Sequence, residues 1–191
     1  ARLPSCKRAL SFFEQHRLIP TKHRWIHFSG ALEFEHLHGF HPLMTFPTKV
    51  DAIQPYQEIP FVGCEPESVF RHTFPFWKNP YWQIPQEMKP RYHALCVLGG
   101  NLVTLLWQSI FQAAEKEMKL PPKVFEPYVQ QITRNLALEA KTALTGPLVR
   151  GDTQTVQKNL KSLEGSHFLL MYQALIDFHE QQKTDTEQRD S

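Results

Sequence analysis

The sequence has little of what would mark several common functions. Its three cysteines, Cys6, Cys64 and Cys96, are odd in number, and their spacing fits neither a zinc site nor a disulfide framework. Thiols this sparse favour a reducing, cytoplasmic setting. The formal net charge is only +2, so charge supports neither a nucleic-acid-binding nor a membrane-surface role. Small molecules and protein partners remain as expected ligands.

Long apolar runs and a secretory leader are also missing. The best apolar stretch, Ala94 to Trp107, is interrupted by two glycines, an asparagine and a threonine, and falls short of the roughly 18 residues that a membrane span needs. We therefore expect no membrane span. The first residue is Ala1 rather than Met, and no charged, apolar and small-residue zones of a signal follow it. This start leads us to expect that an upstream part precedes the chain.

The composition suits a globular fold of one domain or two small ones. Hydrophobic residues make up 41% and charged residues 21% of the 191 positions. A chain of this length can bury roughly 70% of the surface that its unfolded state exposes. The fold therefore needs no disulfide or metal to hold it together.

The N-terminal pattern predicts the end of an α/β unit. Ser5 to His16 has apolar residues at helical spacing, and Trp25 to Phe28 has the pattern of a short buried strand. A turn of small residues, Ser29 to Ala31, follows that strand, at the position where open parallel sheets place ligands. One strand cannot form a sheet. We expect its partners upstream of residue 1, with a further strand at Ile59 to Cys64.

Six of the ten histidines lie between His16 and His41, and three of them are in the next segment, His36 to Phe46. His36 and His38 would share a face if this segment is extended, so a metal site that includes His41 is one hypothesis. No cysteine partner or helical His-Glu spacing supports it, ordinary surface or core histidines are the alternative, and we predict no metal. His41 is more specific, because Pro42 restricts its backbone and leaves an imidazole that can move a proton near neutral pH.

The remainder predicts a helical domain behind a linker. Prolines recur between Glu65 and Pro90 and exclude a long helix there, whereas the aromatic residues among them need burial, so we expect an ordered linker. Arg91 to Met118 is apolar nearly all round, which is typical of the central helix of a bundle that neighbours enclose. Further helices are expected at 122–140, 153–163 and 166–181, before a polar tail that frays.

Two features stand out on the apolar helix. Gly99 and Gly100 cost roughly 1 kcal/mol each in helix propensity, which indicates close approach of another backbone or of a ligand. A polar strip that includes His93 and Asn101 runs along one side. This strip is either a satisfied network between helices or the lining of a site, and we favour the network.

A loop dense in glycine and proline, Ala143 to Asp152, connects two of the later helices. Gly146 and Gly151 permit backbone angles that other residues avoid, and Asp152 can cap the helix that follows. Arg150 therefore projects from a shaped turn. The loop is either a plain connection between helices or one wall of a ligand site.

Several of these stretches together resemble a known family. They are Ser29–Leu32, His41–Phe46, Gly100–Val103 and Leu144–Asp152. They resemble Rossmann-like proteins that carry a C-terminal helical domain of unknown function, number 2520, which are relatives of 6-phosphogluconate dehydrogenase, pyrroline-5-carboxylate reductase and prephenate dehydrogenase. The resemblance covers about residues 5 to 180. It implies an α/β remnant of a Rossmann-like domain with the linker at 1–86, an all-α helical bundle domain at 87–182 and a disordered tail at 183–191.

The resemblance also implies site residues and a cofactor, NADP or NAD. It places His41 as the acid-base or carbonyl-orienting group, Asn101 as a hydrogen-bond partner of the substrate, and Arg150 as an anchor for a carboxylate or phosphate. A catalytic lysine is not expected, because Val97 stands where such relatives have one. The remaining candidates are Ser29, Gly30 and Thr45 on the cofactor side, and Thr145 and Gly146 beside Arg150 on the substrate side.

The chain departs from the family pattern at the cofactor. It has no Gly-x-Gly-x-x-Gly turn to hold a pyrophosphate at a helix N-terminus, so the chain alone is expected to bind a dinucleotide poorly or not at all. The leading hypothesis is the C-terminal part of an NAD(P)-dependent oxidoreductase that acts on a small molecule and forms a homodimer through its helical domain. The alternative is a non-catalytic ligand-binding or assembly module of the same fold.

Overall fold

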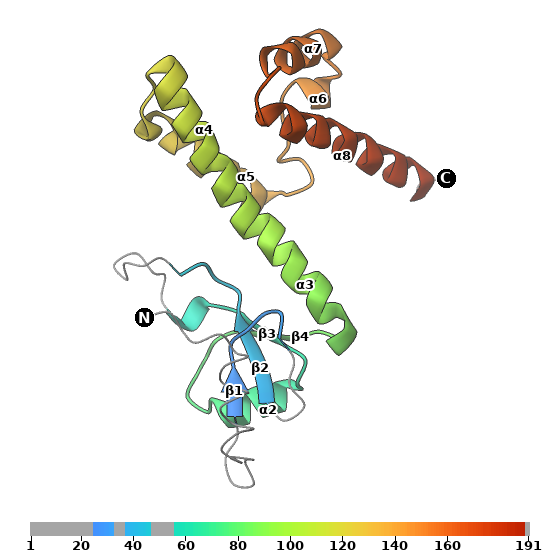
Figure 1. The fold of residues 1–191 in the computed structure, drawn as a ribbon. Coiled ribbons are helices and arrows are strands. Elements are labelled where there is room, and N and C mark those ends of the chain that lie inside the picture. The colour runs from blue at the N-terminus through green and yellow to red at the C-terminus, as the bar shows by residue number, and fades with distance from the viewer. Residues whose placement is uncertain (1–24, 33–36, 47–55, 190–191) are drawn as a thin grey trace, which may run out of the picture. The chain divides into compact units, whose positions relative to one another are not determined.

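The computed structural model describes residues 25–32, 37–46 and 56–189 (Figure 1). The chain forms two compact units, Ala1–Gln112 and Ala113–Ser191, and each is described by itself. The helix expected at Ser5 to His16, together with Cys6 and His36, lies outside the described residues.

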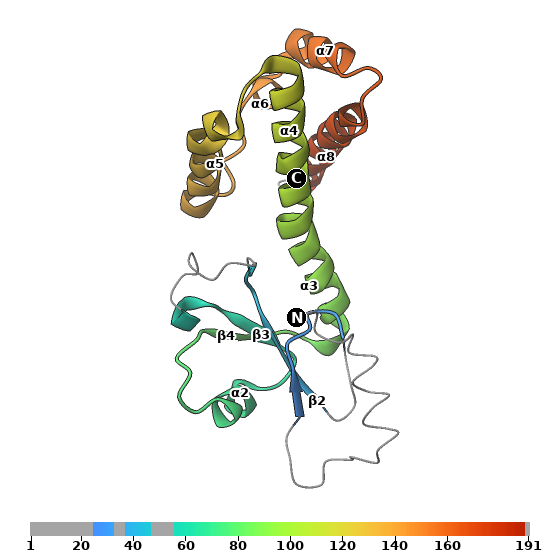
Figure 2. The ribbon, with the colours of Figure 1, turned by 60° about the vertical axis from the view of Figure 1, so that its left-hand side comes forward.

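The first unit contains a four-stranded mixed sheet (Figure 2). Its strands lie in the order β1-β2-β3-β4, with β1 parallel to β2, β2 antiparallel to β3 and β3 parallel to β4. They are β1 (Trp25–His27), β2 (Leu37–Pro42), β3 (Phe61–Gly63) and β4 (Tyr81–Gln83). The strands predicted near Trp25 and Ile59 are confirmed. The partners of β1 were expected upstream of residue 1, but the histidine-rich segment after it also pairs with it, as the parallel strand β2.

Aromatic rings make up the core of this sheet. Phe40 of β2 and Phe70 of helix α2 (Glu67–Thr73) are fully buried, with their ring centroids 5.4 Å apart at an interplanar angle of 68°. Tyr81 of β4 stacks on Phe70 at 4.6 Å. Edge-to-face and offset contacts of this kind add to the hydrophobic stabilisation of buried rings.

The segment predicted as a linker is therefore part of the sheet domain. Between Glu65 and Pro90 the chain forms α2, β4 and the short helix η3 (Gln86–Met88), and η2 (Tyr56–Glu58) precedes β3. Pro66 and Pro85 are the N-cap residues of α2 and η3, and Pro90 lies in the first turn of α3, so these prolines stand at helix starts, where they break no helical hydrogen bond. The proline spacing gave no sign of α2 and β4, the two elements that complete the core.

A long helix follows without a break. It consists of α3 (Lys89–Cys96), the π-helical segment η4 (Val97–Leu102) and α4 (Val103–Met118). The predicted helix is confirmed. The expectation that neighbouring helices enclose it is not, since Leu95, Leu98 and Leu105 are exposed, Leu105 by 61%. Within the described residues, no atom lies within 4 Å of a Cβ built on Gly99 or Gly100. Among the described residues, the helix therefore presents an exposed apolar surface.

Gly99 and Gly100 were expected to interrupt the apolar stretch, but the helix runs through them. From Gln86 to Met118 the helix has 33 residues, and an 18-residue stretch of it has a mean hydropathy of 1.6. By length and composition alone this is enough to cross a membrane. The core helix of a soluble protein passes the same test but is mostly buried, whereas none of this 18-residue stretch is buried among the described residues.

Helices make up the second unit. They are η5 (Pro122–Phe125), α5 (Glu126–Leu138), α6 (Pro147–Arg150), α7 (Thr153–Ser162) and α8 (Phe168–Arg189). Val156 of α7 is buried, and the Asn159 side chain of α7 donates a hydrogen bond to the Tyr172 hydroxyl of α8 over 2.8 Å. The predicted helices are confirmed. The tail expected to be disordered from residue 183 is instead helical to Arg189. The fold is thus an α/β remnant followed by a helical part, mainly α overall.

Candidate functional site

The carboxyl ends of β1 and β2 bring Gly30 and His41 together. The two strands are parallel, so their carboxyl ends meet at one edge of the sheet, where α/β folds place ligands. A Cβ built on Gly30 would lie 3.0 Å from Nε2 of His41 and 2.6 Å from Cδ2 of His93. Only glycine leaves room for both imidazoles at this turn, so Gly30 lies directly beside His41 and His93.

His41 is held in place by a residue that the sequence pattern did not indicate. Its Nδ1 lies 2.8 Å from the hydroxyl oxygen of Tyr92 on α3, and the two rings meet edge to face. The ring centroid of His93 lies 6.2 Å from that of His41. Burial lowers the pKa of His41 below its ordinary value of 6.5, and the nearby His93 and Lys89 lower it further. The imidazole is therefore neutral at pH 7.

Tyr92 lies between His41 and Cys96, which is on the same helix as Tyr92. Its hydroxyl also hydrogen-bonds with Cys96, one turn further along the helix. Burial raises the pKa of Tyr92, and the Cys96 thiol raises it further, so the phenol stays protonated. Because 51 residues separate Tyr92 from His41, no local pattern could have paired them. His93 had been noticed only as part of the polar strip.

The turn after β1 is closed by its own serine. The Ser29 hydroxyl oxygen accepts hydrogen bonds from the backbone N–H groups of Ala31, at 3.3 Å, and Leu32, at 3.1 Å. The backbone N–H of Ser29 donates to Nδ1 of His27 over 3.2 Å. These donors are thus turned towards the protein, so the turn offers no phosphate cradle of free N–H groups.

A buried lysine supports the same turn from α3. Lys89 is only 5% exposed, and its ammonium group donates to the backbone oxygen of Leu32 over 2.6 Å. A Cβ built on Gly39 would lie 2.8 Å from Nε2 of His27 and 2.9 Å from Nζ of Lys89, so this glycine makes room for both. Burial lowers the pKa of His27 to about 4, with a further contribution from the Lys89 charge.

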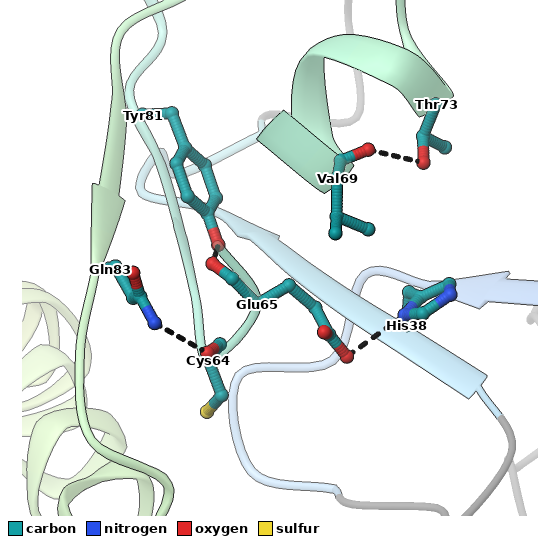
Figure 3. A network of polar contacts seen from close by, with 7 residues as sticks. All are labelled: His38, Cys64, Glu65, Val69, Thr73, Tyr81 and Gln83. Atoms are coloured by element: carbon teal, nitrogen blue, oxygen red, sulfur yellow. Dashed lines mark hydrogen bonds and ion pairs between the residues drawn. The ribbon is translucent and has the colours of Figure 1, made fainter. Parts of the chain in front are cut away.

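Of the three histidines considered as metal ligands, the structure describes His38 and His41, and it does not bring them together. His38 and His41 lie three positions apart on β2 and so face opposite sides of the sheet. Nδ1 of His38 is 2.8 Å from the Glu65 carboxylate, within a group of contacts in which the Tyr81 hydroxyl donates to the backbone oxygen of Glu65 (Figure 3). Among the residues that the structure describes, no three histidine, cysteine, aspartate or glutamate side chains could hold a metal together.

Of the other predicted residues, Thr45 and Asn101 belong to the same unit as His41. Thr45 is exposed in the loop after β2. Asn101 is exposed in the π-helical segment, eight residues beyond His93 and hence about 12 Å further along the helix axis. Thr145, Gly146 and Arg150 belong to the second unit.

The Ala143–Asp152 segment has the shape predicted for it, with one added helical turn. Gly146 has φ 105° and Gly151 has φ 66°, values that favour glycine, and they flank the short helix α6. The Asp152 carboxylate caps α7 by accepting hydrogen bonds from the backbone N–H and the hydroxyl of Thr155. These bonds lower the pKa of Asp152. Arg150 is exposed at the end of α6, as expected.

The described residues supply few of the groups that usually hold the pyrophosphate of a dinucleotide. The backbone N–H groups of Ser29, Ala31 and Leu32 already have partners, and the sequence contains no glycine-rich turn of the Gly-x-Gly-x-x-Gly type. What the chain offers is one edge of a sheet with a fixed, neutral imidazole.

Known proteins share this fold. Protein BF3122 from Bacteroides fragilis, described as a candidate NADP oxidoreductase, is 22% identical, with a TM-score of 0.72 over 93% of this chain and 73% of its own. Protein TM1727 from Thermotoga maritima is 21% identical, with a TM-score of 0.73 over 94% of this chain and 75% of its own. No curated protein is similar enough to count as a match.

The family model agrees with the structural likeness. The model of the domain of unknown function DUF2520 matches residues 67–177, which is more than half of the chain. The match runs from the start of α2 in the sheet domain into the first half of α8. The chain, a Rossmann-like remnant followed by a helical domain, belongs to the DUF2520 family.

Proposed function

We propose that this chain is the substrate-side and dimerisation part of an NAD(P)-dependent oxidoreductase. The observation that carries the proposal is the neutral His41, fixed by Tyr92 at the carboxyl ends of two parallel strands. The description of BF3122 as a candidate NADP oxidoreductase supports the same class of reaction. The substrate is a small molecule with a hydroxyl, carbonyl or imine group.

His41 serves as the proton-transferring group. When the Tyr92 hydroxyl donates its hydrogen to Cys96, its oxygen accepts a hydrogen bond from Nδ1–H of His41. Nε2 of His41 then keeps its lone pair and can take a proton from a substrate hydroxyl, or return one in the reverse direction. Tyr92 is a positioning residue in this scheme, because it sets the tautomer and orientation of His41.

The other predicted residues have proposed roles in the same reaction. Ser29, Gly30 and Thr45 line the cofactor side, and Asn101 hydrogen-bonds to the substrate. When bound, NADP or NAD accepts or supplies a hydride. Since the 191 residues contain no glycine-rich turn, the proposal requires polypeptide outside them to hold the pyrophosphate.

Cofactor binding and turnover test this function. The polypeptide extended upstream to include a glycine-rich turn is titrated with NADPH and NADH by fluorescence, then assayed with hydroxy acids, aldehydes and imines. His41→Gln should lower kcat by about 10²- to 10⁴-fold, the usual contribution of a general acid-base group, without changing the Kd of the cofactor. Tyr92→Phe should lower kcat by about tenfold. Failure to bind either cofactor would refute the proposal.

Arg150 is the proposed anchor for a carboxylate or phosphate of the substrate. It is exposed on α6, so its removal should leave folding unchanged. Arg150→Ala should raise KM for an acidic substrate by about tenfold, because one charge-assisted bidentate contact is lost, whereas Arg134→Ala on α5 should not. An equal effect of both substitutions would contradict the assignment.

The exposed helix supports homodimer formation. Leu95, Leu98, Leu102 and Leu105 leave a large apolar surface that a second copy of the same helix would cover. Light scattering at micromolar concentration should give twice the chain mass, and Leu98→Gln with Leu105→Gln should halve it. Leu138→Gln, at an exposed leucine of α5, is the matched control. A monomer, or recovery of the protein only in membranes, would contradict a soluble dimer.

The alternative is a non-catalytic ligand-binding or assembly module of the same fold. The inward-turned N–H groups of Ala31 and Leu32 favour it, because neither is free to bind a phosphate at this turn. This alternative predicts normal cofactor binding by the extended polypeptide but no turnover with any substrate class. His41→Gln would then change ligand affinity alone.

A further inference from the structure

An unassigned pocket of about 740 Å³ lies beside His41. It lies at the carboxyl end of β2, between the loop after that strand, the segment around η2 and the turn between α2 and β4. Its volume falls within the range of small-molecule sites, roughly 300–1,000 Å³. The pocket is thus large enough for a substrate and borders the proton-transferring group.

Aromatic rings form most of the pocket wall. The centroid of Phe61 lies 6.3 Å from that of Phe28 and 5.6 Å from that of Trp77. Trp77 is itself stacked on Phe74, with centroids 4.2 Å apart and an interplanar angle of 14°. These contacts fix the inner wall before any ligand arrives. Two outer rings, Tyr56 and Phe76, are 60% and 92% exposed and so lack cover from the described residues.

The polar groups of the pocket are few and neutral. Among the described residues that line it, none carries a formal charge, and the polar side chains other than the Tyr56 phenol are His41, Gln57 and Asn79. The buried Asn79 amide donates to the backbone oxygens of Tyr56 and Ile59, so it holds the wall together. His41 is fixed by Tyr92 at one side of this apolar space.

We propose that this pocket binds a neutral, planar aromatic group of the substrate, with the polar end of the substrate at His41. The inference rests on the proposed function, since it names the class of molecule on which His41 acts. Rings fixed in tilted and stacked pairs select a flat apolar group by offset and edge-to-face contact. The absence of charge from the described lining disfavours an ionised group, whose desolvation would go uncompensated.

Binding of an aromatic ketone tests the pocket without any cofactor. The probe is prodan, a neutral naphthyl ketone whose emission shifts to the blue in apolar surroundings, titrated into the 191-residue chain. The Tyr56→Ala, Phe76→Ala double variant should raise the Kd of prodan by about tenfold, because two ring contacts are lost. Both residues are largely exposed, so the variant should fold normally, which circular dichroism checks.

Matched variants separate the pocket from other apolar surfaces. Trp82→Ala removes an exposed ring of β4 outside the pocket, and Leu105→Gln removes a leucine of the exposed helix; both should leave prodan affinity unchanged. 2-Acetylnaphthalene should displace the probe, whereas pyruvate should not. Absence of binding, or equal losses in the pocket and control variants, would overturn the proposal.

Turnover distinguishes this inference from the proposed function. If the extended polypeptide reduces small aliphatic carbonyls with the same kcat/KM as naphthyl ketones, the oxidoreductase stands and the aromatic pocket is refuted. If prodan binds in the pocket and no substrate is turned over with either cofactor, the pocket stands as a binding site and the oxidoreductase fails.

Discussion

Acidification should destabilise the first unit through His27. Its side chain is 9% exposed, its Nδ1 accepts the backbone N–H of Ser29, and burial together with Lys89 lowers its pKa from 6.5 to about 4. In the unfolded chain the imidazole regains its ordinary pKa and binds a proton below pH 6.5. The unfolded state therefore holds more protons between pH 6.5 and 4, and the free energy of unfolding falls as the pH falls through this window.

The size of this effect follows from the two pKa values. At 1.36 kcal/mol for each pH unit between them, the loss reaches about 3 kcal/mol below pH 4, and about 2 kcal/mol of it is present at pH 5. Above pH 6.5 His27 is neutral in both states and contributes no pH dependence. A loss of this size is a large fraction of the stability of an ordinary domain, which is 5–15 kcal/mol.

Urea unfolding followed by tryptophan fluorescence measures this loss. All four tryptophans lie within Ala1–Gln112, so the signal reports the unit that contains His27. His27→Gln keeps an acceptor for the Ser29 N–H but cannot titrate, so its stability should vary less between pH 7 and 5, by about 2 kcal/mol. His72→Gln on α2 should behave like the unmodified chain. The reasoning is wrong if His27→Gln retains the full pH dependence.

Two further substitutions test the backbone at the candidate sites. Gly30→Ala should destabilise the first unit by about 1–3 kcal/mol, because its Cβ would overlap His93, and adding His93→Ala should restore part of that loss in urea unfolding. No restoration would show that the imidazole is not the obstacle. Gly151→Ala should cost about 1–2 kcal/mol, because φ is 66° there, and Gly151→Asn should cost less, since Asn tolerates this region. Equal thermal shifts for both variants would contradict the role of this backbone angle.

Local patterns predicted those parts of the fold that depend on neighbouring residues. The buried strand near Trp25 and the turn at Gly151 follow from side-chain alternation and from backbone angles, both of which a short stretch encodes. The pairing of β1 with β2 was missed, because the histidines of β2 obscured its strand pattern. The prolines around α2 and β4 hid two core elements in the same way.

The candidate site was predictable only in part. His41 and Gly30 could be placed from the residues next to them, whereas the contact between His41 and Tyr92 joins segments 51 residues apart. Lys89 was missed because a lysine beside a proline gives no sign that it will be buried under the Ser29 turn. The apolar helix was recognised, but composition shows only that such a surface needs cover and not which molecule provides it.

The π-helical segment η4 lies between Tyr92, which fixes His41, and the exposed Leu105 of α4. Each residue of a helix turns the next by about 100°, so adding or removing one residue between Tyr92 and Leu105 would rotate the apolar face by that angle relative to His41. Substitutions in this stretch leave that angle unchanged. The number of residues between the two positions is therefore under a stricter constraint than their identity, and insertions there should be rarer than substitutions among working homologues.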